Sequence, residues 1–220
     1  MNPIAYIETD FDTKFGVPRQ SGLVSELLGR IVFLPEYRNP DALRGLDGFS
    51  HIWLIWDFSE VPHDSWSPTV RPPRLGGNVR MGVFATRSPF RPNPIGLSCV
   101  GISRIELHSP DGPVIWVKGA DLMNGTPIFD IKPYLPFTDS HPEATGGFTA
   151  QTLLQPNLRV EVSPQVEALF DEPHLEALRA VLAQDPRPHY QHDKSRVYGF
   201  QFAGKEVHFS VEDDKISVFL

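Results

Sequence analysis

The first two-thirds of the chain contains short runs in which apolar residues alternate with polar ones, separated by glycine and proline turns. A period of two places successive side chains on opposite faces of a strand, so these runs indicate a mainly β fold. Their number and spacing are typical of a barrel or a sandwich. The predicted strands cover residues 30–34, 50–58, 79–85, 97–106, 114–119 and 128–132.

The last third of the chain follows a different period. Apolar residues recur at helical spacing from Val166 to Leu182, after a Ser163-Pro164 pair that is typical of a helix start. Pro173 is expected to break or restart that helix, because its ring cannot be accommodated in a helix interior. Alternating residues between 197 and 211 then predict a small meander, so this part of the chain is expected to be α+β.

Residues 140–147 are rich in helix and strand breakers and predict a linker. We therefore expect a β domain over residues 1–145 and a small α+β module over residues 146–220. A short helix is expected to begin at Asn39, a capping residue that Pro40 follows at the first helical position. No strand is followed by a glycine-rich turn that opens a long helix, which argues against a doubly wound nucleotide fold.

Composition narrows the class of protein. The chain has 220 residues, of which 40% are hydrophobic, and a formal net charge of −7. Its single cysteine, Cys99, excludes an intramolecular disulfide, lies in a predicted strand and is interpreted as an inert buried thiol. Neither a signal peptide nor an apolar run of about 20 residues is present, so we expect a soluble, cytoplasmic protein with no membrane partner.

Residues 85–98 form the segment that points most directly to function. Two arginines and an asparagine alternate there with three prolines, and proline restricts both its own backbone and that of the preceding residue. A stiff loop of this kind can present arginine to a carboxylate or phosphate with little loss of entropy. The alternative is a proline-rich surface turn with solvated arginines. Six arginines and no acidic residue fall between residues 65 and 105 of this acidic chain, which favours an anionic ligand at one face.

Four more segments have the composition of binding loops: residues 17–22, 71–78, 121–127 and 130–136. Structural interpretations compete with functional ones here. Asn124-Gly125 is a typical turn dipeptide, and Asp130 and Lys132 could simply form an ion pair on one face of a strand. The histidines have no cysteine or acidic partners at zinc spacing, and neither a nucleophile elbow nor a P-loop is present. We therefore expect no metal site and no hydrolase or kinase activity.

The loops Pro18-Arg19-Gln20, 71–78, 85–98, 124–127 and 130–137 occur in the order that is typical of the TsaA/TrmO family, which the chain resembles over nearly its whole length. Residues 183–188 resemble the C-terminal signature of the bacterial branch. The resemblance implies S-adenosylmethionine-dependent methylation of N6 of threonylcarbamoyladenosine, beside the anticodon of tRNA. It also implies a single-sheet β-barrel that binds the cofactor outside any Rossmann fold, a homodimer, and a C-terminal module that helps to hold tRNA.

The family's motifs also assign roles to residues of this chain, with Arg87 as the strongest candidate for an essential contact. Two departures stand out: Glu8-Thr9-Asp10 replaces a frequent Arg-Ser-Pro, and Asn124 replaces a frequent aspartate. The asparagine keeps a carbonyl acceptor but loses the charge. By the match of motifs, the residues expected to hold the cofactor are Pro18, Arg19, Gln20, Phe58, Ser59, Arg87, Leu97, Asn124, Gly125, Thr126 and Pro127.

For in-line methyl transfer, the proton on N6 needs an acceptor, and Asp130 or the Tyr134 hydroxyl could serve, or the proton could pass to water. Two alternatives to the enzyme remain: a non-catalytic sensor of S-adenosylmethionine and a structural tRNA-binding protein. The first predicts cofactor binding without a methylated product, and the second predicts salt-sensitive tRNA binding that ignores the cofactor. The residues expected to contact RNA are Arg71, Arg74, Arg91, Arg187, Lys194 and Arg196.

Overall fold

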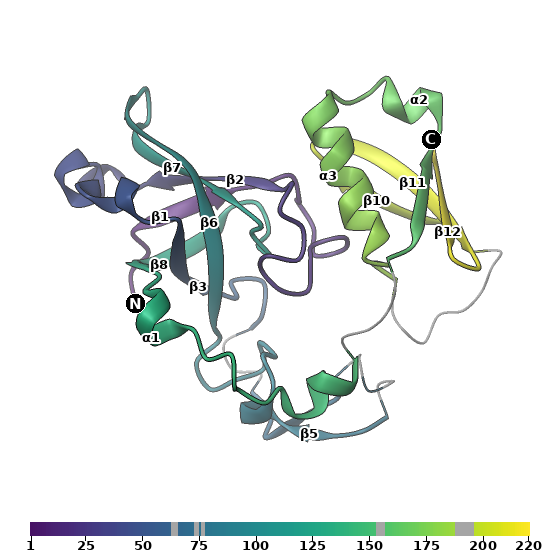
Figure 1. Cartoon of the computed structure of the whole chain (residues 1–220), viewed down its shortest axis with the longest axis horizontal. Helices are drawn as coiled ribbons and strands as arrows, with labels where there is room; N and C mark the ends of the chain where they lie inside the picture. The colour runs from purple at the N-terminus through teal and green to yellow at the C-terminus, as the bar shows by residue number, and fades with distance from the viewer. Residues whose placement is uncertain (63–65, 73–74, 76–77, 153–156, 188–195) are drawn as a thin grey trace.

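The computed structural model describes residues 1–62, 66–72, 75, 78–152, 157–187 and 196–220. Six antiparallel strands close into a barrel in the order β1-β2-β7-β6-β3-β8, and a helix-and-sheet module follows (Figure 1). This confirms the mainly β class and the single-sheet barrel. The barrel strands are β1 (Ala5–Glu8), β2 (Leu28–Phe33), β3 (His51–Asp57), β6 (Ile95–Ser109), β7 (Gly112–Lys118) and β8 (Thr126–Pro133).

Alternation of apolar residues fixes which face of each strand points inward. In β3, Ile52, Leu54 and Trp56 are buried while the residues between them are more exposed. A slip of one residue would turn this whole set to the outside, so the pattern determines the register with β6 and β8. The barrel core is formed mainly by aliphatic side chains: Ala5, Ile7, Ile31, Ile52, Leu54, Val100, Ile115, Val117, Leu122 and Ile128.

The strand ends that carry four of the five predicted binding segments meet at one end of the barrel, whereas residues 130–136 run along β8 to the other end. Glu8 at the end of β1 pairs with Arg30 near the start of β2, and Asp57 at the end of β3 pairs with Ile95 at the start of β6. Thr126, the first residue of β8, lies opposite Ile7. The loops after β1, β3 and β7 therefore converge at this end, although they are far apart in the sequence.

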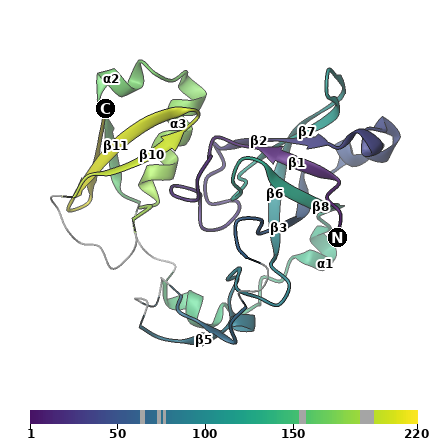
Figure 2. The ribbon, with the colours of Figure 1, turned by 180° about the vertical axis from the view of Figure 1, so that it is seen from behind.

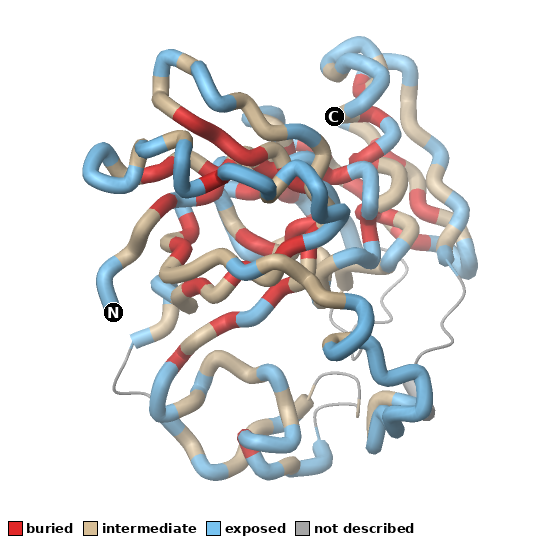
Figure 3. The backbone as a smooth tube through the Cα atoms, turned by 60° about the vertical axis from the view of Figure 1, so that its left-hand side comes forward, coloured by how far each residue is buried: buried red, intermediate tan, exposed pale blue. Residues whose placement is uncertain are grey.

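The loop between β3 and β6, residues 59–94, forms an arm that hangs below the barrel in two opposite views (Figures 1 and 2). It contains β4 (Thr69–Val70), β5 (Met81–Gly82) and the 3₁₀ helix η5 (Val83–Ala85). The predicted strand over residues 79–85 is therefore wrong except at residues 81–82, since β4 offers only two residues for pairing. Little of the arm is buried among its described residues (Figure 3).

Short 3₁₀ helices connect β2 to β3: η1 (Pro35–Tyr37), η2 (Pro40–Leu43) and η3 (Leu46–Gly48). The predicted cap at Asn39 is confirmed, because its side chain accepts a hydrogen bond of 3.0 Å from the Asp41 backbone N–H. The helix that it caps is a 3₁₀ helix and not an α-helix. Asn39 thus fixes the point at which the chain turns into η2.

Two short helical segments lead from the barrel to the C-terminal module, α1 (Pro136–Asp139) and η6 (Gly147–Thr152). The module contains β9 (Arg159–Val162), α2 (Pro164–Glu167), α3 (Glu172–Ala183), β10 (Tyr198–Phe202), β11 (Lys205–Glu212) and β12 (Lys215–Phe219). The restart at Pro173 is confirmed: α3 begins there, and the Asp171 side chain accepts from the His174 backbone N–H at 3.1 Å. The pattern did not predict β9 and β12, which pair in parallel in the sheet β10-β11-β12-β9.

The core of the C-terminal module includes residues from the loop after β1. Phe11, Val24 and Leu27 are buried in the same cluster as the apolar faces of α3, β10 and β11. The rings of Phe11 and Phe202 meet edge to face with centroids 5.5 Å apart. The division at residues 145 and 146 stays a prediction, but the loop after β1 clearly belongs to both parts of the molecule.

Candidate functional site

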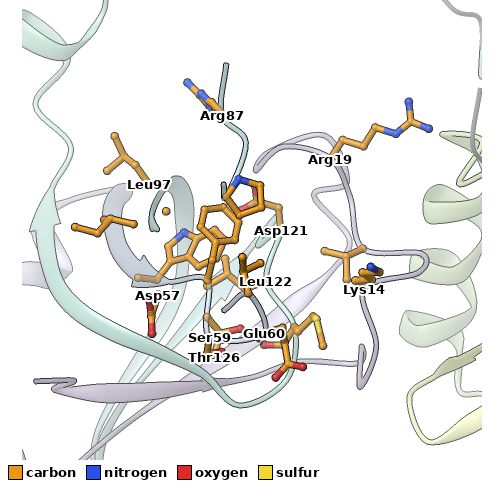
Figure 4. A pocket seen from close by; sticks show the side chains of 18 of the residues that line it. Lys14, Arg19, Asp57, Ser59, Glu60, Arg87, Leu97, Asp121, Leu122 and Thr126 are labelled. Carbon is orange, nitrogen blue, oxygen red and sulfur yellow. Dashed lines mark hydrogen bonds between the residues drawn. The ribbon is translucent and has the colours of Figure 1, made fainter. Parts of the chain in front are cut away.

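A cavity of about 610 Å³ opens where the loops converge at the end of the barrel (Figure 4). Its walls come from the loop after β1, the end of β3, the arm, the start of β6 and the loop after β7. Trp56, Phe58 and Phe90 provide aromatic surface. The lining carries charges of both signs, namely Lys14, Arg19, Asp57, Glu60, Arg87, Arg91 and Asp121.

The arm's arginine-proline loop is tied together by its own side chains. The Arg91 guanidinium donates to the backbone carbonyl of Thr86 at 2.7 Å, with longer contacts to those of Val83 and Ser88. The Thr86 hydroxyl in turn accepts from the Ser88 backbone N–H at 3.2 Å. Arg91 therefore holds the loop in shape, in addition to lining the cavity, where sequence reasoning expected an RNA contact.

This loop presents Arg87 to the cavity, on the side opposite Leu122 in Figure 4. Its Nη1 donates to Oε1 of Gln20 at 2.5 Å, so the arm and the loop after β1 are joined across the cavity mouth. Eight of the eleven residues expected to hold the cofactor are brought together in the lining: Pro18, Arg19, Gln20, Phe58, Ser59, Arg87, Leu97 and Thr126.

At the floor of the cavity, a chain of hydrogen bonds joins β3, β6 and the loop after β7. Trp56 Nε1 donates to Ser98 Oγ at 3.0 Å, and Ser98 Oγ donates to Asp121 Oδ1 at 2.5 Å. The Trp56 indole lies directly over Gly96, where an added Cβ would overlap three of its ring atoms. Its ring also meets that of Phe58, with centroids 4.3 Å apart. Gly96 is therefore the residue that makes room for this aromatic wall.

Asp121 is the cavity residue that sequence reasoning passed over in its assignment of roles. Burial raises its pKa, and the Ser98 hydrogen bond and the Arg87 charge oppose that rise. One sequence signal could have singled it out: a lone carboxylate stands between the apolar Ala120 and Leu122, just after a buried strand. A partly buried carboxylate with a perturbed pKa is typical of functional sites.

Asn124, Gly125 and Pro127 lie outside the cavity lining. Asn124 Oδ1 accepts from the Thr9 backbone N–H at 3.3 Å, and Nδ2 donates to Asp12 at 3.0 Å. Gly125 has a φ of 77°, which explains the glycine at this turn. Both ends of the Asn124 amide are thus used to fasten the loop after β1. Thr9 and Asn124, two positions of departure from the usual family residues, contact each other.

Asp130 and Tyr134 also lie away from the cavity of their own chain. Asp130 forms an ion pair of 2.9 Å with Lys132 on a half-exposed face of β8, as the structural interpretation of this pair expected. The ring of Tyr134 packs against Trp53, with centroids 5.8 Å apart. Their catalytic role stays a prediction.

Arg19 extends from the cavity towards the C-terminal module (Figure 4). Its Nη2 donates to the backbone carbonyls of Arg187 at 3.0 Å and Asp185 at 3.4 Å. The Arg187 guanidinium forms a two-pronged contact with the Asp185 carboxylate, at 2.8 and 2.9 Å. A second cavity, of about 240 Å³, lies beside this contact and shares Lys14 and residues 17–19 with the first.

The residues expected to contact RNA therefore have different surroundings. Arg71 is exposed, and the Arg196 guanidinium lies over the Tyr198 ring at 5.3 Å. Arg187 is largely enclosed by its contact with Asp185. Arg74 and Lys194 lie outside the described residues.

The described part of the chain holds no group of three or more histidine, cysteine or acidic residues that could bind a metal. No helix within it is long and apolar enough to cross a membrane. Cys99 is partly buried in β6, and burial raises the pKa of its thiol, which disfavours the reactive thiolate.

The cavity suits a nucleoside that carries charges of both signs. Aromatic rings offer a face for a purine, arginines can bind a carboxylate, and carboxylates can attract cationic groups. S-adenosylmethionine has all of these features, and the donor set therefore fits the cofactor that the family resemblance implies. The cavity is formed by loops at one end of a barrel and not by the glycine-rich turn and helix terminus of a nucleotide-binding fold.

Comparisons with known proteins agree with this site. The model of the tRNA-methyltransferase O N-terminal domain matches residues 6–140, and that of the TrmO C-terminal domain matches residues 155–220. The tRNA (adenine(37)-N6)-methyltransferase of Escherichia coli (strain K12) is 42% identical and covers 98% of this chain and 94% of the relative. Its namesake from Eikenella corrodens is 48% identical and covers 74% of this chain and 92% of the relative.

A crystal structure of TrmO from Pseudomonas aeruginosa has a TM-score of 0.78 and 33% sequence identity, covering 99% of this chain and 96% of that chain. The likeness thus extends over the barrel and the C-terminal module together. With both family models matched in order along its length, the chain belongs to the tRNA-methyltransferase O family.

Proposed function

We propose that this protein transfers a methyl group from S-adenosylmethionine to N6 of the adenosine at position 37 of tRNA, next to the anticodon. The observation that carries the proposal is the cavity itself, in which Arg87, Trp56 and Asp121 from three distant segments surround one volume large enough for a nucleoside. Two relatives are named for this reaction, and the match to the one from Escherichia coli covers 98% of this chain. The cofactor supplies an activated methyl group on a sulfonium.

The residues of the chain would mainly align the methyl group of the cofactor with N6 of the adenosine. Transfer from a sulfonium disperses positive charge, so it needs exact placement of the two reactants more than a covalent intermediate. We propose that Arg87 and Gln20 hold the carboxylate end of the cofactor, since they meet across the cavity mouth. Trp56 and Phe58 provide the apolar wall beside it.

We further propose that the substrate adenosine carries a threonylcarbamoyl group and that two copies of the chain act together in the cytoplasm. The exposed apolar side chains of Phe84 on the arm and Phe137 on α1 support a dimer, because large apolar groups at a surface favour association. Sedimentation at micromolar concentration tests this: a mass near 49 kDa is expected, twice the 24.7 kDa of one chain.

Lys14 is proposed to bind the carboxylate of the threonyl group. Within the described part of the chain it is the cavity cation without a hydrogen bond or an ion pair, and it lines both cavities on the side of the C-terminal module. The variant Lys14→Met is expected to lower kcat/KM on modified tRNA about 5- to 10-fold, because one exposed charged contact is lost. Lys118→Met, an exposed lysine outside the cavity, is the control and should change nothing. Equal activities of the two variants would contradict this role.

The proposed function is tested by incubating the protein with S-adenosylmethionine and tRNA, followed by digestion and mass spectrometry of the nucleosides. A gain of one methyl group on threonylcarbamoyladenosine, absent when the tRNA lacks that modification, is the expected result. Methylation of plain adenosine at position 37 would keep the enzyme but remove the threonylcarbamoyl specificity. Cofactor binding without any methylated nucleoside would support a sensor instead.

A further inference from the structure

The carboxylate of Asp121 is held in a fixed position in the floor of the cavity. Ser98 donates to its Oδ1 at 2.5 Å, and Trp56 donates to Ser98 in turn, so the side chain cannot rotate without breaking the chain of hydrogen bonds. Side chains locked by a second set of contacts are typical of groups that must meet a substrate in one geometry.

The surroundings also keep this carboxylate basic. Burial raises its pKa, while the Ser98 hydrogen bond and the Arg87 charge lower it, and burial has the larger effect. A carboxylate with a raised pKa is a stronger proton acceptor than an ordinary aspartate when it is ionised, and the hydrogen-bond donors and the cation favour that ionised form. The other charged groups that line the same cavity are Lys14, Arg19, Asp57, Glu60 and Arg91.

The reaction needs such a group. The lone pair of an adenine N6 is delocalised into the purine ring, so N6 becomes a good nucleophile only as its proton leaves. As the N6–CH₃ bond forms and the S–CH₃ bond breaks, the N6–H bond must break, and its electron pair stays on nitrogen. A base in the cavity can take that proton if it lies within hydrogen-bond reach.

We propose that Asp121 is this proton acceptor, positioned by Ser98 and Trp56. The inference rests on the proposed function, because it assigns a residue to that reaction. Atoms balance: the methyl group moves to N6, the proton moves to the Asp121 carboxylate and the neutral thioether is released. Asp130 is less suited in its own chain, since it lies outside the cavity and is paired with Lys132.

The test compares Asp121→Asn with Asp130→Asn in single-turnover methyl transfer to modified tRNA at saturating cofactor. Asparagine keeps the size of the side chain but cannot accept the proton, so Asp121→Asn is expected to be about 10²- to 10⁴-fold slower. Its cofactor Kd, measured by calorimetry, should stay within about threefold of the wild type. Asp130→Asn, which makes the same chemical change on β8, should keep nearly the wild-type rate.

Ser98→Ala gives a readout that a purely structural role would not produce. Because the Ser98 hydrogen bond lowers the pKa of Asp121, its loss should move the acidic limb of the rate profile to higher pH. The limb should disappear in Asp121→Asn. A carbon-13 NMR titration of the aspartate carboxyl groups should show the same shift for the signal that Asp121→Asn removes.

Three outcomes would overturn the inference while the wild type remains active. The first is a wild-type rate in Asp121→Asn. The second is a slow rate in Asp130→Asn alone. The third is a slow rate in Asp121→Asn that is fully explained by weaker cofactor binding. A wild-type protein that makes no methylated nucleoside would instead refute the proposed function. Circular dichroism melting of each variant separates a lost proton acceptor from a lost fold.

Discussion

Gly96→Ala is expected to lower the free energy of unfolding by about 3 kcal/mol or more and the melting temperature by about 6–12 °C. The new Cβ would overlap the Trp56 indole, which is largely buried where it packs over this residue. Trp56 must then leave its position, which breaks its hydrogen bond to Ser98 and opens the aromatic wall of the cavity. Thermal unfolding followed by circular dichroism measures the loss.

Gly48→Ala is the matched control. An added Cβ at Gly48 meets no atom within 4 Å, so this variant should melt within about 2 °C of the wild type. If Gly96→Ala also melts there, the indole has an alternative position of similar energy. In that case calorimetry should still show weaker cofactor binding, because the moved indole no longer forms the cavity wall.

Arg87→Ala is expected to weaken binding of S-adenosylmethionine roughly 10- to 100-fold, because a hydrogen bond to a charged group contributes about 1.5–3 kcal/mol. Arg87 lines the cavity, donates to Gln20 and is displayed by a loop that Arg91 braces. Its removal deprives the cofactor carboxylate of a planar cation and also frees the two sides of the cavity mouth. Isothermal titration calorimetry gives the Kd directly.

Arg80→Ala removes the same charge from the same arm and serves as the control. Arg80 bonds the Thr69 hydroxyl and does not line the cavity, so its Kd should equal that of the wild type. Arg87→Lys should recover only part of the affinity, because lysine lacks the planar fork of the guanidinium. A wild-type Kd in Arg87→Ala would remove Arg87 from the proposed cofactor site.

Alternation of apolar residues predicted five of the six barrel strands, because burial of one face dictates the period. The missing strand, β1, has only four residues and too few alternations to stand out. Residues 79–85 have the composition of a strand but find a partner only at residues 81–82. Whether a segment becomes a strand there depends on its pairing partner, and a local pattern of residues does not identify that partner. The parallel pairing of β12 with β9 could not be predicted for the same reason.

The sequence singled out the proline-rich loop at residues 85–98, and the structure places part of that loop in the cavity lining. Its stiffness could be expected from the prolines, whereas the hydrogen bonds by which Arg91 braces the loop were not expected from the sequence. Asp121 was missed because nothing in its neighbourhood reveals that Ser98 and Trp56, from two other strands, meet it. Asn124 was assigned to the cofactor, yet its amide is used within the fold. The sequence singled out loops that line the cavity, and only the fold shows which of their side chains face it.

Lys14 and residues 17–19 line both the large cavity at the end of the barrel and the smaller cavity beside the C-terminal module. A ligand that changes the shape of this shared wall from one side changes the energy of binding on the other side. By thermodynamic reciprocity, ligands held in the two cavities would then alter each other's affinity by the same factor. Stiffening or loosening this short shared segment should therefore change binding in both cavities at once.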